Sequence, residues 1–90
     1  MNKKEIEFYV DNFKTYKIAD IEILKKYIIF CLNSQQTIGD KHHILPRALF
    51  PQFSSFKNNP WNLSTLSPKD HYIAHALLHE ALENYSVACA

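Results

Sequence analysis

The sequence predicts an α+β domain in which a helical hairpin precedes two short strands and one longer helix. Before residue 34 the apolar side chains recur with a helical period, whereas after residue 40 short β-compatible runs alternate with prolines. A clear helix start at Ser67 follows these runs. Ninety residues are enough for one domain with a small core, and 47% hydrophobic against 21% charged residues argues against a disordered chain.

The first half of the chain has the pattern of two amphipathic helices joined by a short link. Residues 3–15 and 20–34 each carry apolar side chains at helical spacing, and Asp20 is suited to cap the second helix. These apolar residues are Ile6, Tyr9, Val10 and Phe13, then Ile21, Leu24, Ile28, Cys31 and Leu32. The polar segment 33–40 predicts a loop and contains Gly39, the only glycine. We therefore expect a helical segment, residues 1–38, packed on a module of residues 39–90 within one domain.

The second half begins with two runs that permit short strands. His42–Leu45 is compatible with a strand that Pro46 ends, and residues 61–66 permit another. The stretch 46–60 between them contains three prolines together with Asn and Ser, so regular structure should be interrupted there. The aromatic side chains of this stretch are expected to pack against the helices; they are Phe50, Phe53 and Phe56.

The end of the chain shows a well-marked helix. Ser67 is suited as the N-cap, Pro68 occupies the first helical position and Asp70 follows three residues after the cap. We expect the helix to run from about Pro68 to Asn84. Its apolar face consists of Ile73, Ala74, Leu77, Leu78 and Ala81.

The charge balance does not by itself indicate a nucleic-acid-binding protein. The formal net charge is only +1, whereas a self-sufficient DNA-binding domain usually carries a basic stripe. From residue 41 onward four basic residues stand against three acidic ones: Lys41, Arg47, Lys57 and Lys69, then Asp70, Glu80 and Glu83. If DNA is the substrate, affinity must come from a metal, from a few placed cations, or from an additional DNA-binding chain or domain.

Cysteine usage and hydropathy exclude several classes of protein. Cys31 and Cys89 form no CxxC pair, which excludes a zinc ribbon, and two cysteines are too few for a disulfide framework. The N-terminus lacks the apolar run of a signal peptide. The longest apolar stretch, Tyr27–Leu32, has six residues and is too short to span a bilayer. We expect an intracellular, cytoplasmic protein with no membrane partner.

All five histidines lie between residues 42 and 79, in a spacing that suits a metal ion. His42 and His43 are adjacent, and His71, His75 and His79 are four residues apart on the predicted last helix. Positions i and i+4 lie on one helix face, where two imidazoles can bind one metal ion. A third ligand from a strand would leave one coordination position open, which is typical of a catalytic metal site.

Three stretches together resemble the HNH endonuclease family and its ββα-metal fold. They lie within residues 41–80 and are His42-His43-Ile44-Leu45-Pro46-Arg47, Trp61-Asn62-Leu63, and Leu66-Ser67-Pro68-Lys69-Asp70-His71-Tyr72-Ile73-Ala74-His75. The resemblance implies a hydrolase that cleaves DNA phosphodiester bonds with one divalent metal ion, Mg²⁺, Mn²⁺, Ni²⁺ or Zn²⁺, leaving a 5′ phosphate and a 3′ hydroxyl. The family includes phage-encoded and intron-encoded homing enzymes, which implies a host cytoplasm as one place of action.

The resemblance also implies a role for each residue that matches the motif. His42, His71 and His75 correspond to metal ligands, His43 to the general base, and Asn62 to the residue that ties the loop and orients the base. A neutral imidazole with an ordinary pKa of about 6.5 suits general-base catalysis. Successive strand residues point to opposite faces, so His42 and His43 can share a site only where the strand twists strongly or ends.

Several interpretations stay open at this level. The segment 49–59 lacks the glycine pair of many family members, and no cysteine-bound zinc or basic DNA-reading module is present. Arg47 is either a phosphate clamp or a solvated loop charge. The alternative functions are a non-catalytic module with a structural zinc that His79 closes, and a truncated, inactive fragment.

Overall fold

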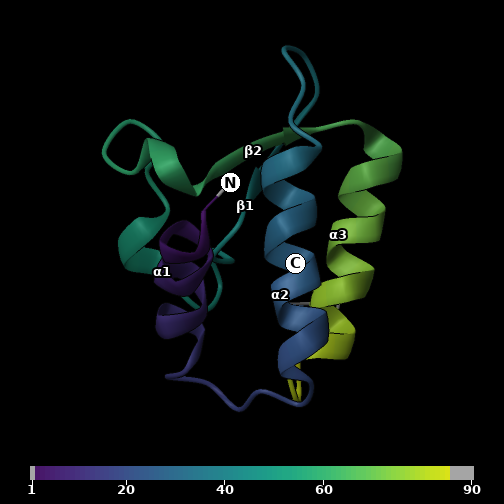
Figure 1. Ribbon diagram of the computed structural model, residues 1–90. Helices are drawn as coiled ribbons and strands as arrows, with labels where there is room; N and C mark the ends of the chain where they lie inside the picture. Colours follow the sequence, from purple (N-terminus) through teal and green to yellow (C-terminus); the bar gives the residue numbers. More distant parts are fainter. Residues whose placement is uncertain (1, 86–90) are drawn as a thin grey trace.

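The residues that the structure describes form three α-helices and one two-stranded antiparallel sheet, with the sheet directly before the last helix (Figure 1). The computed structural model describes residues 2–85, so Cys89 lies outside the described residues. In chain order the α-helices and strands are α1 (Lys3–Phe13), α2 (Ile21–Asn33), β1 (Asp40–His43), β2 (Leu63–Leu66) and α3 (Pro68–Ala81), with short 3₁₀ helices at Pro51–Phe53 and Pro60–Asn62 between the strands. The α+β class is confirmed. No helix within the described range is long and apolar enough to cross a membrane.

Two helix starts follow the caps that the sequence predicts. The Asp20 carboxylate accepts hydrogen bonds from the backbone N–H groups of the second and third residues of α2, at 3.0 and 3.1 Å. The Ser67 hydroxyl accepts the N–H of the third residue of α3 at 3.1 Å, and Pro68 follows it. Each cap satisfies donors that have no partner inside the helix.

The last helix ends three residues earlier than the sequence suggested. We expected it to reach Asn84, but α3 stops at Ala81 because Leu82 pairs with Ile18 in an isolated antiparallel bridge. The Ala81 carbonyl accepts the backbone N–H groups of the two residues that follow Ile18. The connection between α1 and α2 therefore bonds to the end of α3. Beyond the helix, Asn84 adopts a positive φ of 62°.

The first strand is also displaced from its expected position. β1 covers residues 40–43 instead of residues 42–45. The N–H of Ile44 donates to the backbone carbonyl of Asn62 at 2.9 Å, and the N–H of Leu45 donates to the Asn62 side-chain oxygen at 2.7 Å. Both residues are buried, and their backbone N–H groups bond to Asn62 instead of to the opposite strand.

The second strand is shorter than expected because a 3₁₀ turn precedes it. Pro60–Asn62 forms this turn, and β2 begins at Leu63. In the antiparallel ladder His42 lies opposite Ser64, and His43 lies opposite Leu63. The sheet thus ends directly beside the Asn62 turn, at the histidine pair.

The core is formed jointly by all three helices, the sheet and the segment between the strands. Figure 1 shows α2 and α3 side by side and running in opposite directions, with α1 beside the segment that joins β1 to β2. Edge-to-face contacts join α1 to that segment, including Phe13 with Phe50 at 5.5 Å between ring centroids. The largest fully buried hydrophobic side chains are Tyr27, Phe13, Leu24, Ile28, Ile44, Leu45, Leu66 and Leu78.

Gly39 packs tightly against the opposite strand. A Cβ atom at this position would collide with the Leu66 carbonyl oxygen, and the next nearest atom is the Leu66 carbonyl carbon at 2.9 Å. The close backbone approach requires glycine and sets the path of the chain into Asp40.

Candidate metal centre

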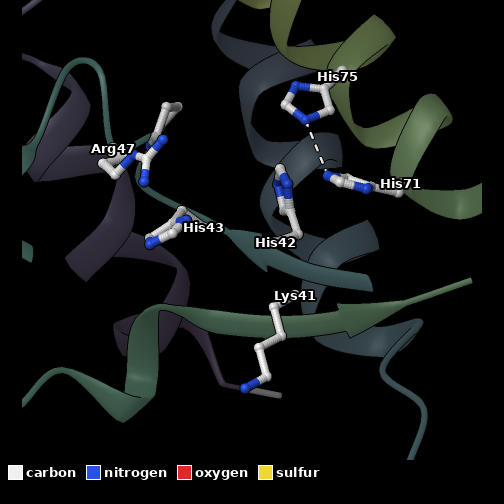
Figure 2. A pocket seen from close by; sticks show the side chains of 7 residues that line it. Lys41, His42, His43, Arg47, His71 and His75 are labelled. Carbon is white, nitrogen blue, oxygen red and sulfur yellow. Dashed lines mark hydrogen bonds between the residues drawn. The ribbon is translucent and has the colours of Figure 1, made fainter. Parts of the chain in front are cut away.

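Three imidazoles from two different elements converge near the end of the sheet. His42 lies on β1, and His71 and His75 lie one helical turn apart on α3. Each offers a ring nitrogen, and these three atoms all lie within 4.8 Å of one another. Figure 2 shows the three rings pointing toward a common point, with the Nε2 atoms of His71 and His75 3.1 Å apart.

Each of the three rings has a hydrogen-bond partner on its other nitrogen. The Nε2 of His42 lies 2.8 Å from the Tyr27 hydroxyl, and the Nδ1 of His71 lies 3.2 Å from the Asp40 carboxylate. The Nδ1 of His75 lies 3.4 Å from the Tyr85 hydroxyl. The atoms left for a shared ion are Nδ1 of His42 and Nε2 of both helix residues. Outer partners of this kind orient imidazole ligands at metal sites.

Burial keeps the two better shielded rings in the neutral form that binds metal. Desolvation, helped by the neighbouring His75, His71 and His43, lowers the pKa of His42 to about 3. Burial and the neighbouring His71 also lower the pKa of His75 below its ordinary value. A metal ligand must be deprotonated, so both shifts fit the donor set.

The arrangement leaves room for a further ligand. In residues 2–85 the group of possible metal ligands holds these three histidines alone, and His79 is exposed and outside it. A cavity of about 250 Å³ opens beside them, lined by Lys41, His42, His43, Pro46, Arg47, His71 and His75. Three protein nitrogens with an open position match a catalytic site, whereas a structural zinc site is closed by a fourth protein ligand. The residues present fit a divalent transition-metal ion.

His43 lies on the opposite face of β1 from His42, but it lines the same cavity as the three clustered histidines. Its ring stacks on Phe56 at 4.1 Å between centroids, and its Nε2 lies 2.9 Å from the Ser54 carbonyl oxygen. A carbonyl only accepts, so Nε2 carries the proton and Nδ1 keeps its lone pair. His42 and His43 can serve one cavity because the strand ends at His43.

Among the described residues, the Asn62 side chain bonds to the segment between the two strands and makes no hydrogen bond to His43. Its fully buried side chain accepts from the Leu45 N–H and donates to the carbonyls of Leu45 at 3.2 Å and Phe53 at 3.1 Å. We expected Asn62 to tie the loop and to orient the base by a hydrogen bond. His43 Nε2 instead donates to the backbone carbonyl of Ser54, the residue that follows Phe53.

Two cations lie at the rim of the cavity. Arg47 and Lys41 are exposed and line it. Figure 2 shows the Arg47 guanidinium on the side of His43, and the Lys41 amine directed away from the three imidazoles. Arg47 is therefore the better placed of the two to contact an anion in the cavity.

Sequence reasoning missed the outer partners of the histidines. Tyr27 has the spacing of a core residue, Asp40 that of a loop residue, and the Ser54 contact uses a backbone atom, which leaves no mark on the sequence. Phe56, expected to pack against the helices, stacks on His43 instead. These contacts span 11 to 31 residues of chain, beyond the reach of a local pattern.

Comparison with known proteins gives no relative from which a role could be transferred. No family model, no curated protein and no solved structure matches this chain.

Proposed function

We propose that this chain is a metal-dependent endonuclease of the HNH type that hydrolyses DNA phosphodiester bonds. One observation carries the proposal: three convergent imidazoles and an additional imidazole, whose Nε2 bonds to the Ser54 carbonyl, line a single open cavity. The motif order of the sequence, with the histidine pair, Asn62 and the two helix histidines, supports the same function.

His43 is the proposed general base. Its Nδ1 has a lone pair because the Ser54 carbonyl holds the proton on Nε2, and stacking on Phe56 fixes the plane of the ring. A base prepared in this way takes a proton from an attacking water without a change of tautomer. Asn62 contributes by fixing the loop that carries Ser54 and Phe56.

His42, His71 and His75 would hold the ion, which when bound would stabilise the negative charge on the phosphate and on the leaving 3′ oxygen. The three nitrogen donors favour transition ions such as Zn²⁺, Ni²⁺ or Mn²⁺ over Mg²⁺, which prefers oxygen ligands. Arg47 is placed to neutralise a non-bridging phosphate oxygen by a charged hydrogen bond.

DNA is the proposed substrate, and the charge of this chain supports weak binding that is detectable at low ionic strength. The net charge of +1 provides little non-specific attraction. We propose that a further DNA-binding chain or domain assists, while the catalytic module acts on the phosphate backbone.

A plasmid-nicking assay tests the proposal. The chain is incubated with supercoiled plasmid and Mg²⁺, Mn²⁺, Ni²⁺ or Zn²⁺, beside His43→Ala and the control His79→Ala, which removes an exposed histidine outside the cluster. Nicking should fall by roughly 10²–10⁴-fold in His43→Ala and stay unchanged in His79→Ala. Cut ends should carry a 5′ phosphate and a 3′ hydroxyl. Equal nicking by His43→Ala and the unaltered chain would refute the base assignment.

A salt titration of DNA binding separates an active enzyme from an inactive fragment. If the chain neither nicks plasmid nor shifts a DNA fragment at low ionic strength, the endonuclease proposal fails.

A further inference from the structure

Tyr27 connects the N-terminal helical segment to the candidate metal centre. It lies on α2, outside the segment that resembles the nuclease motif, and its side chain is completely buried. The hydroxyl lies 2.8 Å from His42 Nε2 and 2.7 Å from the Ile44 carbonyl oxygen, and it also interacts with the Cys31 thiol. One phenol group thus contacts both a candidate ligand and the backbone two residues beyond it.

The position of one proton decides what Tyr27 does to His42. A carbonyl oxygen cannot donate, so the hydroxyl proton of Tyr27 is directed to Ile44. The hydroxyl oxygen must then accept a hydrogen bond from the Nε2–H group of His42. His42 is therefore held as the Nε2–H tautomer, and its lone pair is on Nδ1.

This tautomer is the one that the cluster needs. With Nε2 occupied by Tyr27, Nδ1 is the remaining nitrogen of His42 for an ion shared with His71 and His75. The opposite tautomer would place a proton where the ion binds and an unpaired nitrogen beside the hydroxyl. The Tyr27 ring also meets the imidazole edge-on, at 81° and 5.9 Å between centroids, which restricts rotation of the ring.

We propose that Tyr27 is a positioning residue of the metal centre, fixing the tautomer and the ring orientation of His42. This inference rests on the proposed function, and it makes α2 a part of the metal site as well as a packing element.

Burial makes Tyr27 a more influential outer partner than Asp40. Asp40, the partner of His71, is about half exposed at 48%, so water can take over its hydrogen bond. Tyr27 is inaccessible to solvent, and water cannot readily replace its hydroxyl. Removal of an outer partner typically lowers metal affinity 10–100-fold, and Tyr27 should lie toward the upper end of this range.

Tyr27→Phe is the direct test, with Tyr9→Phe as a matched control. Tyr9 is also a buried tyrosine of the helical segment whose hydroxyl donates to a backbone carbonyl, that of Trp61 at 2.6 Å, but it has no contact with a histidine of the cluster. Co²⁺ binding is measured by the visible absorption of the ion and by calorimetry on the full chain. We expect the Co²⁺ dissociation constant to rise 10–100-fold in Tyr27→Phe and less than about 2-fold in Tyr9→Phe. Equal affinities in the two variants would overturn the inference.

A second measurement needs no variant and stays informative if Tyr27→Phe does not fold. Long-range ¹H–¹⁵N correlation spectra of the metal-free chain report which ring nitrogen of each histidine carries the proton. His42 should show the Nε2–H form alone, whereas the Nδ1–H form would overturn the inference.

The Co²⁺ titration and the correlation spectra test Tyr27 independently of the plasmid-nicking assay, because neither measurement uses DNA. If the plasmid remains uncut while Tyr27→Phe weakens Co²⁺ binding, the positioning role is supported and the endonuclease proposal fails. If the unaltered chain binds no Co²⁺, both the metal centre and the role of Tyr27 are refuted.

Discussion

The Asp40 carboxylate lies 3.2 Å from Nδ1 of His71 and accepts a hydrogen bond from it, while Nε2 of His71 is directed toward His75. The two residues are 31 positions apart, and they meet because β1 begins at Asp40, near the start of α3. A carboxylate that accepts from one imidazole nitrogen increases the basicity of the other nitrogen, the one that would bind a metal ion.

Asp40→Asn should therefore weaken metal binding without loss of the fold. We expect roughly a 10-fold rise in the Co²⁺ dissociation constant, at the low end of the range for outer partners because the pair is partly exposed. Asp70→Asn is the control, since it removes the same charge directly beside His71 in the sequence. If both variants lose affinity equally, the loss of negative charge explains the weaker metal binding, and the Asp40–His71 hydrogen bond does not.

His75→Ala and His79→Ala should differ sharply in their response to Zn²⁺. The two residues are one turn apart on α3, but only His75 belongs to the cluster. With free Zn²⁺ at about 100 times its dissociation constant, the free energy of unfolding should increase by about 2.7 kcal/mol in the unaltered chain and in His79→Ala. The increase should nearly vanish in His75→Ala. Chemical denaturation with and without Zn²⁺ measures it, and equal responses of the two variants would argue against the cluster.

Asn62→Ala should destabilise the protein much more than Asn59→Ala. The Asn62 side chain bonds to Leu45 and Phe53 in a fully buried position, and its loss leaves these backbone groups without partners. We expect a loss of about 3 kcal/mol in the free energy of unfolding. The Asn59 amide donates to the Ser55 carbonyl in an exposed place, so Asn59→Ala should cost below about 1 kcal/mol. Urea denaturation curves measure both free energies of unfolding. Similar losses in the two variants would show that the Asn62 hydrogen bonds do not stabilise the loop.

Acid should destabilise the metal-free protein through His42. Its pKa is lowered from 6.5 to about 3 in the folded state, chiefly by burial, so the unfolded state binds more protons between these values. The free energy of unfolding is thus unaffected by His42 above pH 6.5 and falls as the pH drops from 6.5 toward 3. The slope contributed by this one group approaches 1.4 kcal/mol per pH unit.

Urea denaturation with a chelator at pH 7 and pH 5 measures this dependence. His42→Gln should show a smaller loss over the same interval, with the remainder from His75, whose pKa is lowered in the same direction. An identical pH dependence in the two proteins would contradict the assignment.

Gly39→Ala should cost about 1–3 kcal/mol in the free energy of unfolding, the usual range for overpacking. The added Cβ meets the backbone carbonyl of Leu66, which cannot rotate away as a side chain would. Because Gly39 precedes Asp40, metal affinity should also fall. Thermal unfolding and Co²⁺ titration test the two effects, and a change below about 0.5 kcal/mol would show that the chain accommodates the methyl group.

The sequence by itself determined the features that depend on neighbours along the chain. Asp20 and Ser67 set the starts of α2 and α3 because a capping side chain acts on backbone donors two or three residues away. His71 and His75 could be paired from their spacing alone, since the helix period places them on one face. The α+β class followed from the same local patterns.

Only the tertiary structure decided where the strands begin and end and which nitrogen of each imidazole is free. Asn62 draws Ile44 and Leu45 out of the expected strand, and Leu82 leaves α3 to pair with Ile18. The proton positions on the histidines depend on Tyr27, Asp40 and the Ser54 carbonyl, which are distant in sequence or belong to the backbone. Hydrogen bonds of this kind depend on distances that exist only after the chain has packed.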